Sequence, residues 1–580
     1  MKDTEAAMTR MYRFGDVVID CARFSTIRNG QSEKITPRAF EVLLYLIEHR
    51  DRVVEKQELF AQVWKASFVS DNALTRMIKE IRQVLGDEAD APRYIETVHR
   101  RGYRFIAELK DESPTGVPTR APALSSIAVL PFANLSGDPE SDYLSDGIAE
   151  SIINLLSSLP SLRVAPRSSS FRYKGQDAAL EAGRDLGVRA VLSGRVLHHS
   201  QMLIVKTELI DVAEERQLWG EQYQQPFSDI FALQSEIARD ISAKLQVKLT
   251  GEEQQRLTRR YEMNSEAYRL YLKGRYFWNR RPGGLEKAIQ YFEQSLELMP
   301  NCALTWSGLA DCYSTLGSWE DGSVPPRDVM PMALAAATKA LELDPELAEA
   351  HASLAYIKIH YDWDWKGAEQ ECQEAIRLKP DFAGAYHWYS HLLVTQGRFA
   401  ESLAASQHCL SLDHLDLIHN NHLGWHFYHA RQYDAALAQH LKTLELDPHS
   451  VWPNCELGRT YEQKQMFAEA IEAFQQASEM TSSSFPVAGL GHVYGKAGHR
   501  EKALEQLAVL KQRAQEGYVS SFSLALIHIG LGEYEPALDL LEQAYTERSG
   551  WMAYLKVDPR LDPLQTEPRF YALLSRLGLV

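Results

Sequence analysis

Residues 70–105 read SDNALTRMIKEIRQVLGDEADAPRYIETVHRRGYRF, and this stretch decides the fold of the first part of the chain. Leu74, Ile78, Ile81 and Leu85 recur at steps of four, three and four, which predicts a helix with one apolar face. Its opposite face is polar and can reach phosphates and base edges when a helix lies in a major groove. That face carries Asn72, Thr75, Arg76, Lys79, Arg82 and Gln83.

Two strands are expected after this helix, at Tyr94–Val98 and Tyr103–Ile106. The loop that joins them, His99-Arg100-Arg101-Gly102, is basic, and its glycine is expected to supply the positive φ of a tight hairpin. The pattern favours a second contact with nucleic acid at this loop. The alternative is a helix and hairpin that only pack, with solvated basic side chains.

A small antiparallel sheet and two more helices are expected before this stretch. Thr36-Pro37 is typical of a helix start, with threonine as the cap and proline in the first turn. The expected strands are Tyr12–Phe14, Val17–Asp20, Phe24–Arg28 and a run near Lys34-Ile35, and a further helix is expected at Glu55–Trp64.

This order, with TPRAFEVLLYLIEH and YIETVHRRGYRF, resembles the winged-helix domain of the OmpR/PhoB family over about residues 10–108. The resemblance implies that the third helix enters the major groove and that the wing touches the minor groove and phosphates. Glu80 departs from the basic character of that helix. The implied DNA-binding residues are Asn72, Thr75, Arg76, Lys79, Arg82, Thr97, His99, Arg100, Arg101 and Tyr103.

The position of this domain resembles the ToxR/CadC-like subgroup, in which the DNA-binding domain comes first. Only about ten residues precede it, so no phosphorelay receiver is expected in front. Residues 109–123 contain Pro114, Pro118 and Pro122 and predict a flexible linker where such relatives often have a membrane helix.

Charge and cysteine content also bear on the partners and the compartment. Residues 1–110 hold 19 Lys and Arg against 17 Asp and Glu, whereas the rest of the chain has a net charge of −18, so nucleic acid is expected to contact the first domain. The six cysteines are scattered, which favours a reducing compartment. With no apolar run of about 18 residues and no signal peptide, the sequence predicts a cytoplasmic protein without membrane contact.

Residues 124–250 alternate between strand and helix patterns and predict an α/β domain. The runs IAVLPFANLSGDPESDYLSDGIAESIINLL and LWGEQYQQPFSDIFALQSEIA resemble the TolB amino-terminal-like domain that accompanies some bacterial regulators and nucleotide cyclases. No phosphate-binding glycine motif follows a strand here. The cluster Ser168-Ser169-Ser170 beside Arg167 and Arg172 is open to two interpretations, an anion-binding loop or a solvated loop.

Residues 266–580 predict an all-α array, because LELMP, LELDP, IRLKP, LSLDH and LELDP end at 300, 345, 380, 414 and 448. A spacing of 34 residues is that of tetratricopeptide helix pairs, and we expect about eight pairs with residues 559–580 as a cap. The extra residues of the 45-residue interval are expected in a loop at 318–327. Such arrays present a groove for a protein or peptide.

Histidines are concentrated in this array, with His419, His422, His426 and His429 along one expected helix. They suggest either a metal site or acid sensor, or a repeat helix with partly packed and partly wet histidines. The second interpretation is favoured, because no carboxylate or cysteine in the pattern completes a ligand set. We therefore expect no metal, no cofactor and no catalytic residue.

Together these patterns predict a multidomain protein with a winged helix-turn-helix, an α/β middle domain and an all-α tetratricopeptide solenoid. The predicted function is a bacterial, non-enzymatic transcriptional regulator that reads double-stranded promoter DNA and uses its other domains to sense a signal or recruit partners. RNA polymerase is an expected partner, and the resemblance implies dimers on DNA. The alternatives are a repeat scaffold whose winged helix contacts protein, or a cyclase-associated regulatory protein.

Overall fold

The computed structural model describes two parts of the chain, residues 11–107 and 126–580, with gaps. The gaps are 16, 21–24, 29–30, 34, 51, 57, 60–70, 89–90, 99–100, 139–140, 160, 175–178, 200–201, 246–263, 281–282 and 319–323. The chain divides into two compact units, Met1–Ala121 and Pro122–Val580. The predicted linker 109–123 lies outside the described residues.

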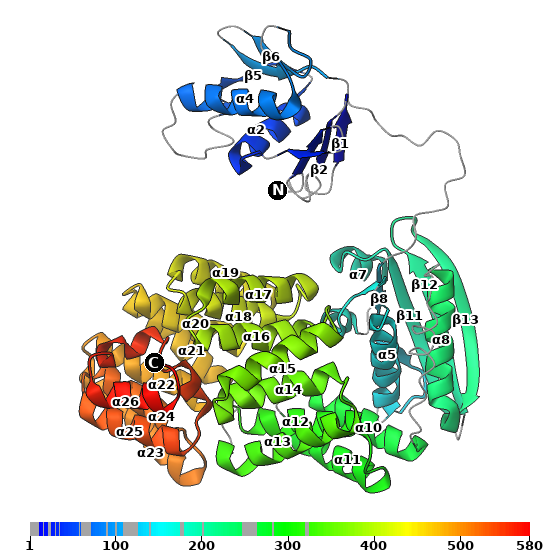
Figure 1. Ribbon diagram of the computed structural model, residues 1–580. Coiled ribbons are helices and arrows are strands. Elements are labelled where there is room, and N and C mark those ends of the chain that lie inside the picture. Colours follow the sequence, from blue (N-terminus) through cyan, green and yellow to red (C-terminus); the bar gives the residue numbers. More distant parts are fainter. Residues whose placement is uncertain are drawn as a thin grey trace. The chain divides into compact units, whose positions relative to one another are not determined.

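The first unit contains two small sheets (Figure 1). Four antiparallel strands form the first sheet in sequence order, and the second has the order β5-β7-β6. The strands are β1 (Met11–Phe14), β2 (Val17–Asp20), β3 (Ser25–Arg28), β4 (Gln31–Glu33), β5 (Val54–Glu55), β6 (Ile95–Val98) and β7 (Gly102–Phe105). The fourth strand therefore lies before the run at Lys34-Ile35 that the sequence favoured.

Helices α2 (Pro37–Glu48) and α4 (Asp71–Leu85) pack on one hydrophobic core with these sheets. The apolar stripe of α4 is buried as predicted, because its spacing of three and four residues keeps those side chains on one face. Most of the helix expected at Glu55–Trp64 lies outside the described residues. The winged-helix prediction is confirmed by the order of these elements.

The middle part of the chain forms a six-stranded mixed sheet. Its main path is β10-β8-β11-β12-β13, with β9 paired to β11; β8 is parallel to β10 and β11, and the last three strands are antiparallel. The strands are β8 (Ser126–Val129), β9 (Ala133–Asn134), β10 (Arg163–Val164), β11 (Ala190–His199), β12 (Met202–Asp211) and β13 (Arg216–Pro226).

Helices α5 (Asp142–Ser157) and α8 (Ile230–Lys244) lie beside this sheet in Figure 1. Their apolar side chains share one buried core with those of the sheet. A second, smaller core includes residues of α7 (Ala179–Asp185). The shorter elements are α6 (Arg167–Ser170), η2 (Phe171–Tyr173) and η3 (Phe227–Asp229). The α/β prediction is therefore confirmed.

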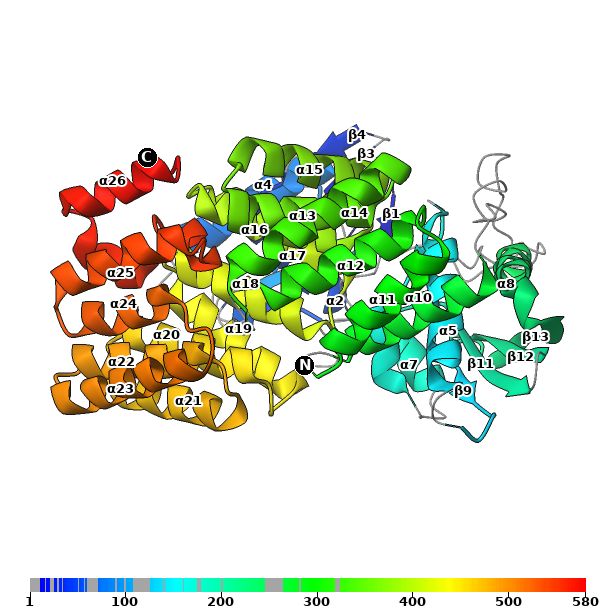
Figure 2. The same ribbon diagram turned by 90° about the horizontal axis from the view of Figure 1, so that it is seen from below.

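The rest of the chain is a stack of helix pairs, seen from two sides in Figures 1 and 2. Within the described residues, α10 to α25 form eight pairs, as the 34-residue period predicted. The pairs are α10 (Ser265–Trp278) and α11 (Leu285–Leu298), α12 (Ala303–Leu316) and α13 (Pro326–Leu343), α14 (Ala348–Ile357) and α15 (Trp365–Leu378), α16 (Ala383–Thr395) and α17 (Phe399–Leu412), α18 (Leu417–His429) and α19 (Tyr433–Leu446), α20 (Val451–Gln463) and α21 (Phe467–Met480), α22 (Ser484–Lys496) and α23 (Arg500–Glu516), and α24 (Ser521–Gly530) and α25 (Tyr534–Thr546).

Three short elements close the array: η5 (Gly550–Tyr554), η6 (Pro559–Leu564) and α26 (Pro568–Arg576). The π-helical turn η4 (Lys358–Asp362) extends α14. The extra residues of the long interval fall between α12 and α13 and in the longer α13. None of the described helices is both long and apolar enough to cross a membrane.

Candidate nucleic-acid interface and repeat groove

The polar face of α4 contains the side chains that the sequence proposed for DNA. Thr75, Arg76 and Lys79 are exposed on it, with Lys79 about one helical turn after the other two. Asn72 lies in the first turn of the same helix, but its side chain is outside the described part of the structure. The buried stripe on the other face sets the direction in which these exposed groups point.

The end of α4 is fixed to the strand that follows. Gly86 has a φ of +66°, and the amide of Asp87 donates to the carbonyl of Arg82 at 2.8 Å, which is a Schellman C-cap. The buried carboxylate of Asp87 accepts hydrogen bonds from the amides of Arg93 (2.6 Å), Tyr94 (3.2 Å) and Ile95 (2.9 Å). The helix and the wing therefore keep a set geometry relative to each other.

Arg82 lies between the helix and the wing. Its Nη2 donates to the carbonyl of Ile95 and to Oγ1 of Thr97, both at 2.9 Å, and its side chain is only 12% exposed. The sequence placed Arg82 and Thr97 among the DNA contacts. Because the guanidinium is used inside the domain, we assign to Arg82 a positioning role.

A contact inside the domain explains why the acidic Glu80 departs from the basic character of the helix. Its carboxylate accepts hydrogen bonds from the amide of Thr36 (2.7 Å) and from the Thr36 hydroxyl (3.1 Å), at the start of α2. Thr36 occupies the N-cap position of α2, but its side chain makes no capping hydrogen bond of its own. The acidic group therefore joins two helices and complements the dipole of α2.

The wing differs from the prediction at two residues. Tyr103 is 5% exposed and belongs to the hydrophobic core, so we assign it to packing and omit it from the proposed contacts. Gly102 does not have a positive φ; instead, a Cβ there would lie 1.9 Å from the carbonyl oxygen of Val54. This glycine is required by the close approach of β5 and β7, where Val54 pairs with Tyr103. Arg101 is exposed, and His99 and Arg100 lie outside the described residues.

The serine cluster of the middle part contacts the repeat array. The hydroxyls of Ser168 and Ser169 both donate to the carboxylate of Asp413, and Arg172 donates to the carbonyls of Leu415 (3.3 Å) and Leu446 (3.2 Å). The interpretation as a solvated loop is therefore wrong, and the anionic group that the cluster holds is a carboxylate of this chain. The acceptors come from residues 243 to 274 positions away, which no local pattern shows.

Helix α10 strengthens the same association. Ala267, Tyr268 and Leu272 share one hydrophobic core with the middle sheet. Glu150 of α5 accepts from Arg167 and from Arg275 of α10, each at 2.8 Å. The middle sheet and the first repeat are therefore packed as one body.

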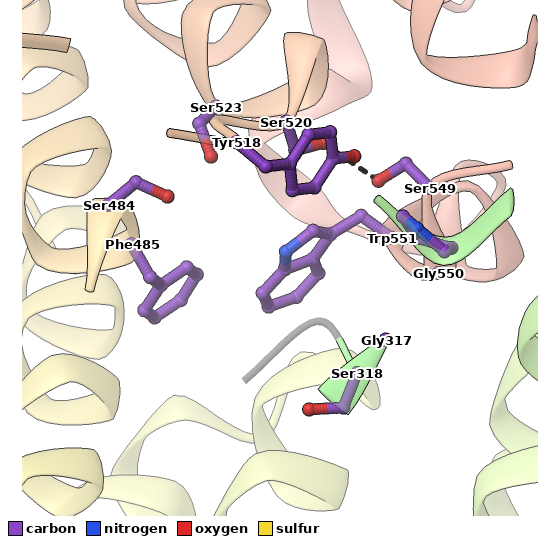
Figure 3. A pocket seen from close by; sticks show the side chains of 11 residues that line it. Gly317, Ser318, Ser484, Phe485, Tyr518, Ser520, Ser523, Ser549, Gly550 and Trp551 are labelled. Carbon is purple, nitrogen blue, oxygen red and sulfur yellow. Dashed lines mark hydrogen bonds between the residues drawn. The ribbon is translucent and has the colours of Figure 1, made fainter. Parts of the chain in front are cut away.

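The inner helices of the array are covered by the chain's own residues 550–564, here called the C-terminal segment. Its Trp551 stacks on Phe485 of α22 (centroids 4.9 Å apart) and on Phe522 of α24 (5.7 Å). Figure 3 shows Phe485 and Trp551 lining a pocket with serines of α22, α24 and the preceding turns, and the hydroxyls of Ser520 and Ser549 are 2.9 Å apart there.

A buried ionic network holds the same segment to α20. Arg459 donates to Glu456 (3.0 Å) and to Asp558 (3.3 Å), and Arg560 donates to Asp558 at 2.6 Å. The Arg459 guanidinium also lies over the ring of Tyr428, 4.4 Å from its centroid. The groove predicted for a peptide thus already contains a segment of this chain.

Three known families match this sequence. The family described as transcriptional regulatory protein, C terminal, matches residues 30–105; the HilA/YgeH-like transcriptional regulator, second domain, matches 123–240; and the tetratricopeptide repeat matches 454–483. The resemblance of the middle part to a TolB amino-terminal-like domain stays a prediction.

Several curated proteins are similar to the chain. Transcriptional regulator HilA of Salmonella typhi is 27% identical over 397 residues, 67% of this chain and 68% of that protein. Putative adenylate cyclase 3 of Rhizobium meliloti (strain 1021) is 37% identical over 242 residues, 41% of each chain. Transcriptional activator CadC of Escherichia coli (strain K12) is 31% identical over 141 residues, 22% of this chain and 28% of that protein. The match to the cyclase thus spans well under two thirds of that relative.

The fold and these matches indicate the class: the chain has the winged-helix domain of transcriptional regulatory proteins and is similar to transcriptional regulators. Within that class it resembles the OmpR/PhoB-type regulators of the ToxR/CadC-like kind, and it carries a tetratricopeptide array behind its middle domain.

Proposed function

We propose that this protein binds double-stranded promoter DNA through α4 and the wing. The observation that carries the proposal is the exposed set Thr75, Arg76 and Lys79 on a helix that Asp87, Arg82 and Glu80 hold in place. A fixed helix with exposed donors can present them together to one groove. Asn72, Thr97, His99, Arg100 and Arg101 complete the proposed contact set.

The test is a titration of the full-length chain with promoter fragments found by genome-wide mapping of bound DNA. Arg76→Ala and Lys79→Ala should each lower specific affinity by about 1 to 3 kcal/mol, roughly 5- to 150-fold. The affinity of the unchanged protein should fall steeply with salt, with a logarithmic slope of about −0.9 for each phosphate contacted.

Arg377→Ala is the matched control, because Arg377 is also an exposed arginine but lies in the acidic repeat array. Its affinity for DNA should equal that of the unchanged protein. An affinity that does not respond to salt, or that survives both α4 substitutions, would contradict the proposal.

The remaining parts of the chain are proposed to receive a signal or to recruit partners. The middle sheet and α10 share a hydrophobic core, so a signal received by one would act on both. The domain limits predicted from the sequence, 124–250 and 266–580, place them in separate domains. A protein ligand of the array would have to displace the C-terminal segment or bind outside it. Contact with RNA polymerase and dimers on DNA belong to this proposal.

We further propose that the chain is not an enzyme and that it works in the cytoplasm, where promoter DNA is found. HilA and CadC, by their names, are transcriptional regulators. The five described cysteines are free thiols, in keeping with a reducing compartment. Incubation with ATP and Mg²⁺ tests the first point, since any release of a cyclic nucleotide would contradict it.

A further inference from the structure

Buried histidines meet between α16, α18 and the C-terminal segment. His387 and His391 lie four residues apart on α16, and His422 faces them from α18. All three side chains are at most 5% exposed. Imidazoles that are removed from water need partners for their ring nitrogens.

The three rings bring nitrogens together. His422 Nδ1 lies 3.0 Å from His391 Nε2 and 3.2 Å from His387 Nε2, and a donor nitrogen from each residue falls within 4.8 Å of the others. Zinc binds imidazole nitrogen at about 2.0–2.1 Å, so that tetrahedral ligands lie about 3.4 Å from one another. The spacing suits one small cation.

A chain of hydrogen bonds decides which nitrogen of His391 carries its proton. His360 Nδ1 is 3.0 Å from the carbonyl of Tyr356, which can only accept, so Nδ1 of His360 is the donor. Burial lowers the pKa of His360 to about 3, so the ring is neutral and its Nε2 accepts from the Tyr554 hydroxyl at 2.8 Å. That hydroxyl then accepts from His391 Nδ1, also at 2.8 Å. Nε2 of His391 is left with a lone pair.

The two short nitrogen contacts cannot both be good hydrogen bonds between neutral rings. If His422 Nδ1 carries a proton, it can point fully at only one of its two neighbours. If His422 Nδ1 carries no proton, its lone pair faces the lone pair of His391 Nε2 at 3.0 Å. A cation that accepts three lone pairs removes the conflict.

We propose that His387, His391 and His422 form a binding site for a divalent transition-metal ion of the zinc type. Three imidazole nitrogens without a carboxylate suit zinc and its first-row neighbours, whereas Mg²⁺ and Ca²⁺ require oxygen ligands. The rings of His387 and His422 are nearly parallel, at 13°, so coordination requires one of them to turn about χ2, a broad torsion in histidine.

Tyr554 supplies the supporting hydrogen bond that metal-bound histidines have on their second nitrogen. Because Tyr554 belongs to the C-terminal segment, the ion would also help to hold that segment against α16. This site lies in the repeat array and does not depend on DNA binding by α4.

The test uses the full-length chain without a purification tag. After incubation with Zn²⁺ and removal of the excess, we expect about one zinc per chain by elemental analysis. With Co²⁺, the visible spectrum should be that of tetrahedral nitrogen ligation. His391→Asn and His422→Asn should each lose most of the bound metal, and His440→Asn should keep it. His440 is the matched control, a buried histidine of α19 outside the group of three.

Tyr554→Phe keeps all three ligands and tests the supporting hydrogen bond. Zinc affinity should fall about 10- to 100-fold in this variant. An unchanged affinity would overturn the role of Tyr554. If His391→Asn or His422→Asn fails to fold, the zinc affinity of Tyr554→Phe and the cobalt spectrum of the unchanged chain still test the site.

Three results would overturn the site itself. The first is an unchanged protein that binds neither Zn²⁺ nor Co²⁺, and the second is a His422→Asn variant that binds as well as the unchanged protein. The third is a cobalt–thiolate band that disappears in Cys409→Ser. Cys409, His387 and His419 form a neighbouring group, and that band would assign the metal to them.

Discussion

Glu80 shows how one side chain can support the helix proposed to bind DNA through contacts inside the domain. Its carboxylate accepts two hydrogen bonds from Thr36 and so connects α4 to the start of α2. Its negative charge lies where the positive end of the α2 dipole favours it. The helix that presents the exposed Arg76 and Lys79 therefore has its Glu80 carboxylate paired inside the domain.

Glu80→Gln should loosen this connection. The loss of charged hydrogen bonds at a partly exposed site should lower the local stability of α2 by about 1 kcal/mol, which is roughly a fivefold faster hydrogen exchange of its amides. The measurement is hydrogen exchange of the full-length chain. Glu88→Gln, at an exposed position after α4, should leave the exchange unchanged. Equal exchange in the two variants would contradict this role.

Gly102→Ala should disrupt the wing. A Cβ at 1.9 Å from the Val54 carbonyl oxygen forces β5 and β7 apart, and we expect a loss of about 1 to 3 kcal/mol. Far-UV circular dichroism during urea unfolding, together with DNA affinity, measures the effect. Gly517→Ala is the control, because nothing lies within 4 Å of a Cβ there. A stable Gly102→Ala variant with normal affinity would refute the steric argument.

Among the elements, the C-terminal segment closes the repeat array from inside. Trp551 stacks on α22 and α24, Tyr554 hydrogen-bonds to His360 and His391, and Asp558 pairs with Arg459 of α20. An ordinary capping helix covers only the last repeat. This segment instead contacts five inner helices, α16, α18, α20, α22 and α24, as well as η4, so its removal would open several repeats.

Asp558→Asn should destabilise the array by about 3 to 5 kcal/mol, because it leaves the buried Arg560 without its carboxylate and leaves Arg459 with Glu456 alone. Although burial alone would raise it, Arg560 and Arg459 hold the pKa of Asp558 far below its usual range. This contribution is present above pH 4 and should be lost as the pH falls below it. Urea denaturation at several pH values measures both effects.

Asp562→Asn is the matched control in the same segment. Asp562 pairs with Arg431 at 2.7 Å, but both side chains are more than 40% exposed. The expected loss is at most about 1 kcal/mol. Equal losses in the two variants would mean that burial does not decide the strength of these pairs.

On the scale of the whole molecule, buried histidines make the second unit sensitive to acid. Burial lowers the pKa values of His360, His429 and His440 to about 3, and those of His387, His391 and His426 also lie well below the ordinary range. Their unfolded forms bind protons below pH 6.5, so acid favours unfolding.

The metal-free chain should therefore lose stability between pH 7.5 and 5.5. Each of the six histidines contributes about 1.4 kcal/mol of loss at one pH unit below its unfolded pKa. His351 and His419 have raised pKa values, because Glu371 and Asp416 outweigh burial. Their contribution to the stability of the folded state therefore increases as the pH falls, opposite to that of the six histidines. The net loss should be roughly 5 kcal/mol in urea denaturation with a chelator present. An equal stability at both pH values would contradict the buried, neutral state of these rings.

The local patterns were good predictors wherever an element buries one face. The stripe of Leu74, Ile78, Ile81 and Leu85 predicted α4 over its full length, and the 34-residue period predicted the helix pairs. Patterns did not show the tertiary partner of a polar side chain. Arg82 and Tyr103 were predicted to contact DNA; in the structure Arg82 donates to Thr97 and Tyr103 packs in the core.

By itself, the sequence determined the three kinds of fold, their order, and the helix that presents Arg76 and Lys79. Periodicity is enough for this, because it reports which face of an element is removed from water. Only the tertiary structure decided that Asp413 binds the serine cluster, that Asp558 meets Arg459 and that Tyr554 reaches His391, across 245, 99 and 163 residues. Burial of a face does not specify which distant segment covers it, and that choice depends on packing and on the pairing of buried polar groups.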